Sequence, residues 1–103
     1  MPILPENPTL ADYQAYVAAF EVEHGFEEQN ILEKCLLLGE EMGELFKAVR
    51  QREGIKIDTP GGEVALELAD ILIYLCAIAN RCNVDLEAAF RMKETINQKR
   101  KWV

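Results

Sequence analysis

Two pairs of carboxylates in this chain have the spacing of one helix face. Glu41 and Glu44 are three residues apart in GEEMGEL, and Glu67 and Asp70 are three residues apart in ELAD. Residues three apart on a helix are neighbours, so each pair would place two negative charges side by side. Hard divalent ions such as Mg²⁺ and Mn²⁺ prefer carboxylate oxygens, and no His or Cys joins these pairs. The spacing therefore predicts a Mg²⁺ site, which Mn²⁺ would also fit.

A solvated acidic surface is the alternative interpretation. Like charges at this spacing cost an exposed helix only about 0.2–0.5 kcal/mol per pair, so Glu40, Glu41 and Glu44 alone favour the surface. Glu67 and Asp70, however, lie in the most apolar segment of the chain, where an unpaired charge costs several kcal/mol. They would need either a metal ion or a Lys or Arg across the fold. The repeat of the spacing in both segments favours the metal.

Four segments have the period and the punctuation of helices, and these must position the carboxylates. Thr9 with Asp12, Asn30 with Glu33, and Asp85 resemble N-terminal caps. Glycines 25 and 54 follow the first two segments as stops. We expect helices at residues 10–24, 31–53, 63–82 and 86–102. No segment alternates with period two, so the sequence predicts one all-α domain over residues 1–103, a four-helix bundle that oligomerises.

The apolar pattern predicts which faces of these helices are buried. In the second helix, Leu38, Met42, Leu45 and Val49 form an apolar stripe beside the acidic row. The segment 63–82 is apolar almost all round, as expected of a helix covered on every side. The cysteines are odd in number and form no CxxC motif, so we expect three buried small side chains rather than a disulfide or zinc site: Cys35, Cys76 and Cys82.

Composition and charge narrow the possible partners. The net charge is −7, but residues 1–90 hold 17 acids and 6 bases, whereas residues 91–103 hold one acid and five bases. This balance argues against binding a nucleic-acid polymer and indicates a local anion site near the C-terminus. The first residues lack the pattern of a signal peptide, and no window has 18 uncharged apolar residues. We therefore expect a cytoplasmic protein without a membrane segment.

The acidic motifs resemble a known family. EEMGE at 40–44, followed after 22 residues by ELAD at 67–70, is similar to the ExxE…ExxD signature of MazG-like nucleotide pyrophosphohydrolases, within the all-α NTP pyrophosphatase superfamily. The similarity runs from about residue 32 to 102. It implies that Glu41, Glu44, Glu67 and Asp70 bind Mg²⁺, and that Glu40 orients or deprotonates the attacking water. It also implies hydrolysis of nucleoside triphosphates between the α and β phosphates by a homodimer or homotetramer.

Donor side chains in the last helix fit this resemblance. The row of Leu86 and Phe90 continues as Lys93, Asn97 and Arg100, which is similar to the K…N…K/R element with which the family contacts phosphates or the nucleoside. The alternative is that Lys93 extends along an apolar surface and that the basic end stabilises the helix C-terminus.

Two further residues are candidates for substrate binding. Phe26 falls where some members of the family stack an aromatic on the base, although an aromatic after a helix stop more often fills a core. Lys34 precedes Glu41 on the same helix row, and it would either reach a phosphate or pair with an acid. Tyr74 follows Asp70 by one turn and is interpreted as a core tyrosine whose hydroxyl bonds an acid.

Two alternative functions remain open at this point. Phosphoribosyl-ATP pyrophosphohydrolase shares the helical acidic architecture, so only substrate tests distinguish it. A non-catalytic helical dimer could also use the acids to bind metal for stability, but this hypothesis leaves Glu40 and the donor row of the last helix unexplained.

Overall fold

The computed structural model describes residues 1–56 and 61–100 of the chain. Over these ranges the protein is helical and contains no strand, which confirms the predicted all-α class. The helices are α1 (Leu10–His24), α2 (Ile31–Arg52), α3 (Val64–Arg81) and α4 (Leu86–Lys99).

The predicted helix starts are confirmed by their caps. Thr9 and Asp12 form a reciprocal capping box at α1, and the Asn30 side chain accepts a hydrogen bond from the Glu33 amide at 2.8 Å. Asp85 likewise accepts from the backbone at the start of α4. Gly25 adopts φ 73°, the left-handed conformation that favours glycine at a helix end. Local hydrogen bonding therefore sets these boundaries. The last helix ends at Lys99, one residue before the extended C-cap Arg100, and residues 101–102 of its predicted range lie outside the described residues.

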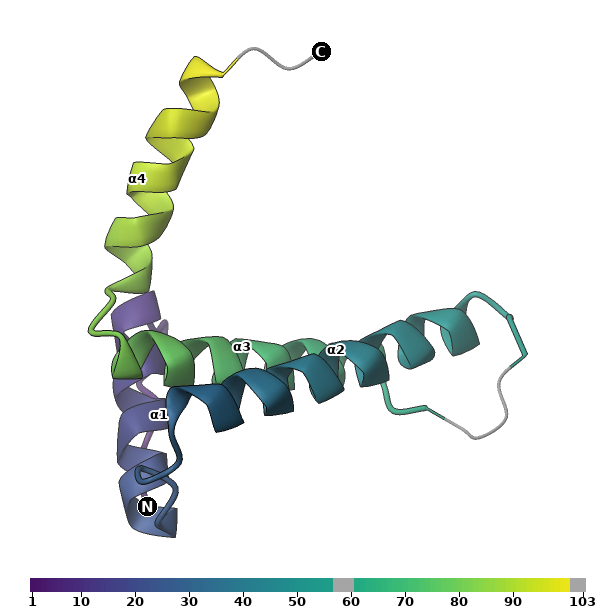
Figure 1. The fold of residues 1–103 in the computed structure, drawn as a ribbon, viewed down its shortest axis with the longest axis horizontal. Helices are drawn as coiled ribbons and strands as arrows, with labels where there is room; N and C mark the ends of the chain where they lie inside the picture. The colour runs from purple at the N-terminus through teal and green to yellow at the C-terminus, as the bar shows by residue number, and fades with distance from the viewer. Residues whose placement is uncertain (57–60, 101–103) are drawn as a thin grey trace.

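The helices do not close into one compact bundle. Helices α2 and α3 lie side by side as a hairpin, α1 packs across α3, and α4 extends from the end of α3 away from that hairpin (Figure 1). The small core joins Val17 of α1 to Cys76 and Ala77 of α3, with Leu72 and Leu86 packed against it. The turn before α4 is fixed to α1 by one side chain, because Gln14 bonds both sides of that turn.

The predicted burial of the apolar stripe on α2 holds for only half of its residues in a single chain. Leu38 and Leu45 are partly buried, but Met42 and Val49 are 42% and 41% exposed. The fully buried side chains of α2 are Lys34 and Ala48. Glu41, from the neighbouring acidic row, meets two acids of α3. The apolar stripe is therefore only partly covered.

The sequence also predicted that α3 is buried on every side and that the apolar row of α4 is buried. Neither is observed in the described residues. Leu66 and Leu68 of α3 are 62% and 51% exposed, because α1 and α2, the main neighbours of α3 among the described residues, leave part of its surface uncovered. Phe90 of α4 is 67% exposed, since α4 extends away from α2 and α3 (Figure 1). The cysteine prediction holds for Cys76 only. The other two thiols, Cys35 and Cys82, are exposed.

Candidate metal site and substrate cavity

Three of the four predicted metal ligands come together between α2 and α3. Glu41 of α2 and Glu67 and Asp70 of α3 each place one carboxylate oxygen within 4.8 Å of the others. We call these three residues the carboxylate cluster. Helices α2 and α3 lie side by side (Figure 1), and this pairing brings Glu41 to the i, i+3 acids of α3.

The electrostatics of the carboxylate cluster favour a bound cation. The pKa of Glu41 is raised from 4.5 to about 7, first by burial, then by a hydrogen bond with Glu67 and by the negative charges of Asp70, Glu67 and Glu44. A carboxyl group that holds its proton near neutral pH lacks a positive neighbour. A divalent ion would supply that charge and displace the proton.

A pair of glycines brings the loop before α3 against the cluster. The Gly61 amide donates a hydrogen bond to the side-chain oxygen of Gln51 at 2.6 Å, and a Cβ on Gly61 would lie 3.3 Å from the amide nitrogen of Ala48. A Cβ on Gly62 would collide with the carboxylate of Glu67. The absence of a side chain at Gly62 therefore leaves room for the Glu67 carboxylate, and the absence of one at Gly61 lets the loop lie close to α2.

Glu44 and Glu40 lie beside the cluster rather than within it. Both are exposed on α2. The charge of Glu44 contributes to the raised pKa of Glu41, so the two carboxylates are electrostatic neighbours. The pKa of Tyr74 is raised by burial and then by the charges of Glu41, Asp70 and Glu40, which places this hydroxyl in the same negative field. The metal role of Glu44 and the catalytic role of Glu40 stay predictions.

A cavity of about 330 Å³, which we call the aromatic cavity, adjoins the carboxylate cluster through Asp70. Phe26 and Lys34, two predicted substrate-binding residues, line it together with Tyr74. The Lys34 ammonium lies 5.6 Å from the ring centre of Phe26 and 5.7 Å from that of Tyr74. A cation at this distance from two aromatic faces is attracted by both. The structure thus places a donor between aromatic side chains next to the acids.

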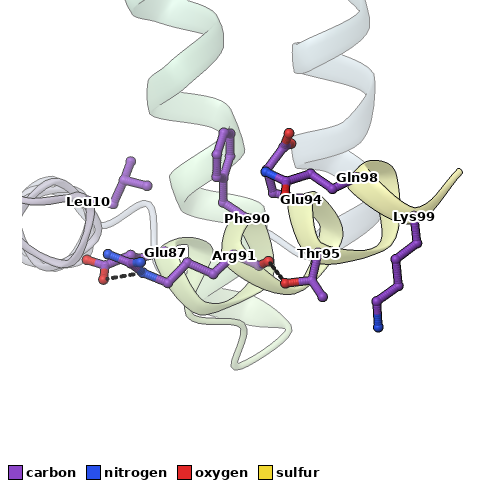
Figure 2. A pocket seen from close by; sticks show the side chains of 8 residues that line it. All are labelled: Leu10, Glu87, Phe90, Arg91, Glu94, Thr95, Gln98 and Lys99. Carbon is purple, nitrogen blue, oxygen red and sulfur yellow. Dashed lines mark hydrogen bonds and ion pairs between the residues drawn. The ribbon is translucent and has the colours of Figure 1, made fainter.

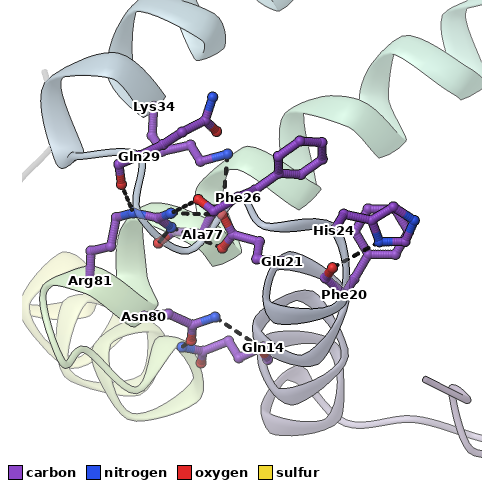
Figure 3. Close-up of polar contacts among 10 residues, drawn as sticks. All are labelled: Gln14, Phe20, Glu21, His24, Phe26, Gln29, Lys34, Ala77, Asn80 and Arg81. Atoms are coloured by element: carbon purple, nitrogen blue, oxygen red, sulfur yellow. Dashed lines mark hydrogen bonds and ion pairs between the residues drawn. The ribbon is translucent and has the colours of Figure 1, made fainter. Parts of the chain in front are cut away.

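An ion triad that the sequence analysis missed adjoins this cavity, with Glu21 and Lys34 in the cavity lining. Arg81 donates to both oxygens of Glu21, at 2.9 and 2.7 Å, and Lys34 pairs with Glu21 Oε2 at 3.2 Å (Figure 3). Burial alone would raise the pKa of Glu21, but the hydrogen bonds and charges of Arg81 and Lys34 lower it overall. A signal was present, since Glu21 continues the row of the core residues Tyr13 and Val17. Lys34 does pair with an acid, as one interpretation expected, but the acid is Glu21.

The predicted donors Lys93, Asn97 and Arg100 are not brought to the carboxylate cluster within one chain. They lie on α4 or at its C-cap, and α4 runs away from the α2–α3 hairpin (Figure 1). A separate cavity of about 660 Å³ follows α4, with Phe90 in its lining (Figure 2). None of the clustered carboxylates lines this cavity. The substrate roles of the three donors stay predictions.

Three acids that converge from two paired helices of an all-helical fold are the arrangement expected of a helical site for a divalent metal ion. The sequence model of the MazG nucleotide pyrophosphohydrolase domain matches residues 28–103, and the chain belongs to this family. It is 40% identical to dCTP pyrophosphatase 1 of Homo sapiens, over 91% of this chain and 59% of that protein. The Bos taurus protein of the same name is also 40% identical, with 91% and 60% covered. The chain thus spans about three fifths of the length of these relatives. Within the described residues, every helix is too short or too polar to cross a membrane.

Proposed function

We propose that this protein is a Mg²⁺-dependent nucleoside triphosphate pyrophosphohydrolase that cleaves deoxynucleoside triphosphates between the α and β phosphates. The observation that carries the proposal is the convergence of Glu41, Glu67 and Asp70 from two helices. Membership of the MazG family supports the reaction class. The names of the relatives make dCTP the first substrate to test. A cytoplasmic role in removing surplus or non-standard nucleotides would follow from this activity.

The donor set fits Mg²⁺. Oxygens around this ion lie about 2.0–2.1 Å from the metal, so neighbouring ligands are about 3–4 Å apart. Oxygens already within 4.8 Å of one another reach that spacing by small side-chain rotations. Glu44, on the same face of α2, would provide a fourth carboxylate. When bound, the metal would neutralise phosphate charge and lower the pKa of a water molecule.

The protein's own residues then have separate tasks in the reaction. Glu40 would accept a hydrogen bond from the attacking water and take its proton as the new P–O bond forms. The anhydride P–O bond breaks, and pyrophosphate leaves with the electron pair. The carboxylate cluster would hold the polyphosphate in place through its metal, so that most of the rate comes from positioning and charge neutralisation. The aromatic cavity beside Asp70 would receive the base, with Phe26 against one of its faces.

We also propose that the site is completed by a second copy of the chain, in a homodimer or homotetramer. The described part of one chain leaves large apolar side chains half-exposed or more on all four helices. They include Leu36, Phe46, Leu66, Leu68, Phe90 and Met92. The donors of α4 lie away from the carboxylates of their own chain (Figure 1). Association through these apolar faces would bring Lys93, Asn97 and Arg100 to a partner's carboxylate cluster and bury the exposed side chains.

A panel of canonical and modified deoxy- and ribonucleoside triphosphates tests the function. Each is incubated with the protein and Mg²⁺ or Mn²⁺, and pyrophosphate is resolved from orthophosphate. We expect monophosphate and pyrophosphate with the wild type and no product with Asp70→Asn, which conserves shape but removes a charge. Glu28→Gln, an exposed acid outside the site, is the matched control. Full activity of Asp70→Asn, or no pyrophosphate from any substrate, would refute the proposal.

Mixing two inactive variants tests the shared site. Glu41→Gln loses an acid of the carboxylate cluster, and Lys93→Met loses a donor of α4. If one copy supplies the acids and another the donors, mixed assemblies contain sites in which both groups are intact. We expect about a quarter of the wild-type activity to return on equimolar mixing and subunit exchange, because a quarter of the sites then combine intact acids with intact donors. A mixture as inactive as its components, with exchange shown by mass spectrometry, would contradict the arrangement.

A further inference from the structure

The buried ion triad of Glu21, Lys34 and Arg81 carries an excess positive charge. Glu21 and Lys34 are only 6% and 4% exposed, and the Arg81 side chain is 14% exposed. Two cations thus share a single carboxylate. A buried charge costs several kcal/mol unless it is paired, so the second cation is not explained by stabilising Glu21 alone.

Hydrogen-bond geometry identifies which member of the triad has donors left for a ligand. Arg81 uses all five of its N–H groups: two on Glu21, and three on the backbone carbonyls of Gln29, Phe26 and Ala77. Both Glu21 oxygens already accept bonds from Arg81. Lys34 makes one oxygen contact among the described residues, the 3.2 Å ion pair with Glu21. An ammonium has three N–H donors, so up to two of them can serve a ligand.

The position of Lys34 fits a base rather than a phosphate. Lys34 precedes Glu41 by seven residues of α2, which is two helical turns or about 10 Å along the axis. A triphosphate held by the carboxylate cluster would therefore extend its nucleoside toward Lys34. The ammonium also lies within about 6 Å of the ring centres of both Phe26 and Tyr74, which line the aromatic cavity. Aromatic walls suit the faces of a base, and a charged donor suits an oxygen on its edge.

We propose that Lys34 is a specificity-determining residue that donates a hydrogen bond to an exocyclic carbonyl oxygen of the nucleobase. Glu21, itself held by Arg81, is the positioning residue that fixes the Lys34 ammonium at the cavity wall (Figure 3). Cytosine, thymine, guanine and hypoxanthine carry such an oxygen, whereas adenine has none. The protein therefore selects against adenine nucleotides. This inference rests on the proposed function.

Steady-state kinetics of Lys34→Met test the proposal with dCTP, dTTP, dITP and dATP. Loss of a hydrogen bond from a charged donor predicts a fall in kcat/KM of about 10- to 100-fold for the three carbonyl-bearing substrates, mainly through KM. The value for dATP should change by less than about twofold. The substitution leaves the Glu21–Arg81 pair in place and removes the excess charge, so the fold should survive. Lys56→Met, an exposed lysine beyond the far end of α2, is the control.

Three outcomes would overturn the assignment. Unchanged kinetics would show that Lys34 does not contact the substrate. An equal loss on all four substrates would indicate a structural or phosphate-binding role. If Lys34→Met does not fold, Glu21→Gln replaces it, and it must show the same dependence on the base.

Calorimetry separates this inference from the proposed function. Binding of dCMP and dAMP in EDTA requires neither metal nor hydrolysis. We expect the wild type to bind dCMP more tightly than dAMP, and Lys34→Met to lose that difference. If no triphosphate is hydrolysed but this preference and its loss are seen, the function fails while the base contact stands. Equal binding of the two monophosphates by the wild type, or no binding of either, would refute the contact.

Discussion

Replacing Glu41 by Gln is expected to stabilise the metal-free protein while abolishing its activity. The pKa of Glu41 is raised from 4.5 to about 7, first by burial and then by the hydrogen bond and negative charges around it. The folded state therefore holds this proton more tightly than the unfolded chain, so the ionised side chain opposes folding above pH 7. This opposition fades as the pH falls from about 7 toward 4.5.

The size of the effect follows from the same pKa. A change from 4.5 to about 7 corresponds to at most about 3 kcal/mol. Because Glu41 is partly solvent-exposed, screening reduces the expected gain to about 1–2 kcal/mol. For a domain of this size, that gain raises Tm by roughly 5–15 °C.

Thermal unfolding at pH 8 and pH 5 measures this difference. In EDTA at pH 8 the Glu41→Gln variant should melt above the wild type, and at pH 5 the two should converge. With Mg²⁺ the wild type should gain stability by mass action, whereas the variant should gain little. Glu28→Gln, which removes an exposed acid, should follow the wild type in both buffers. A variant that melts at or below the wild type in EDTA at pH 8 would refute the electrostatic reasoning.

Three further perturbations probe the supporting structure. Arg81→Met leaves Glu21 with Lys34 alone and removes three backbone contacts, so the free energy of unfolding should fall by about 3–5 kcal/mol in urea titrations; a loss below 1 kcal/mol would contradict a structural triad. Gly62→Ala forces the Glu67 carboxylate to move, so calorimetry should show at least tenfold weaker Mn²⁺ binding with an unchanged circular dichroism spectrum; unaltered affinity would argue against Glu67 as a ligand. The pKa of Glu21 is lowered by Arg81 and Lys34 against the effect of burial, so its stabilising contribution is complete above pH 4.5 and is lost as acid protonates it. Acid titration of Glu21→Gln should show a shallower loss of stability than that of the wild type, and parallel curves would contradict this.

Features determined by neighbours in the chain were predictable from the sequence. The caps at Thr9, Asn30 and Asp85 depend on side chains that bond amides two or three residues away. The meeting of Glu41 with Glu67 and Asp70 was also anticipated, because the i, i+3 spacing of the acids fixes a helix face. Glu44 illustrates the limit of this reasoning, since its position at the edge of the cluster depends on the exact rotation of α2 against α3.

Features that depend on distant parts of the chain were not predictable. Glu21 and Arg81 are sixty positions apart, and the period of each helix alone does not show that they meet. The direction of α4 likewise depends on tertiary contacts, so an apolar row that continues to Phe90 did not reveal which surface would cover it. The apolar stripe of α2 was predicted to be buried, but Met42 and Val49 are exposed because one neighbouring helix covers only part of the α2 surface.

The side chain of Gln14 has a consequence for the assembly of the molecule. Its amide group bonds the side-chain oxygen of Asn80, the carbonyl of Val84 and the amide of Leu86, and so spans the whole turn from α3 into α4. Helix α4 is thereby aimed before any partner arrives. An arm that already points in the bound direction loses less conformational freedom on docking, which favours tight association of small subunits. Gln14, which bonds the turn at the start of α4, thus favours the contacts that the far end of α4 would make with a partner.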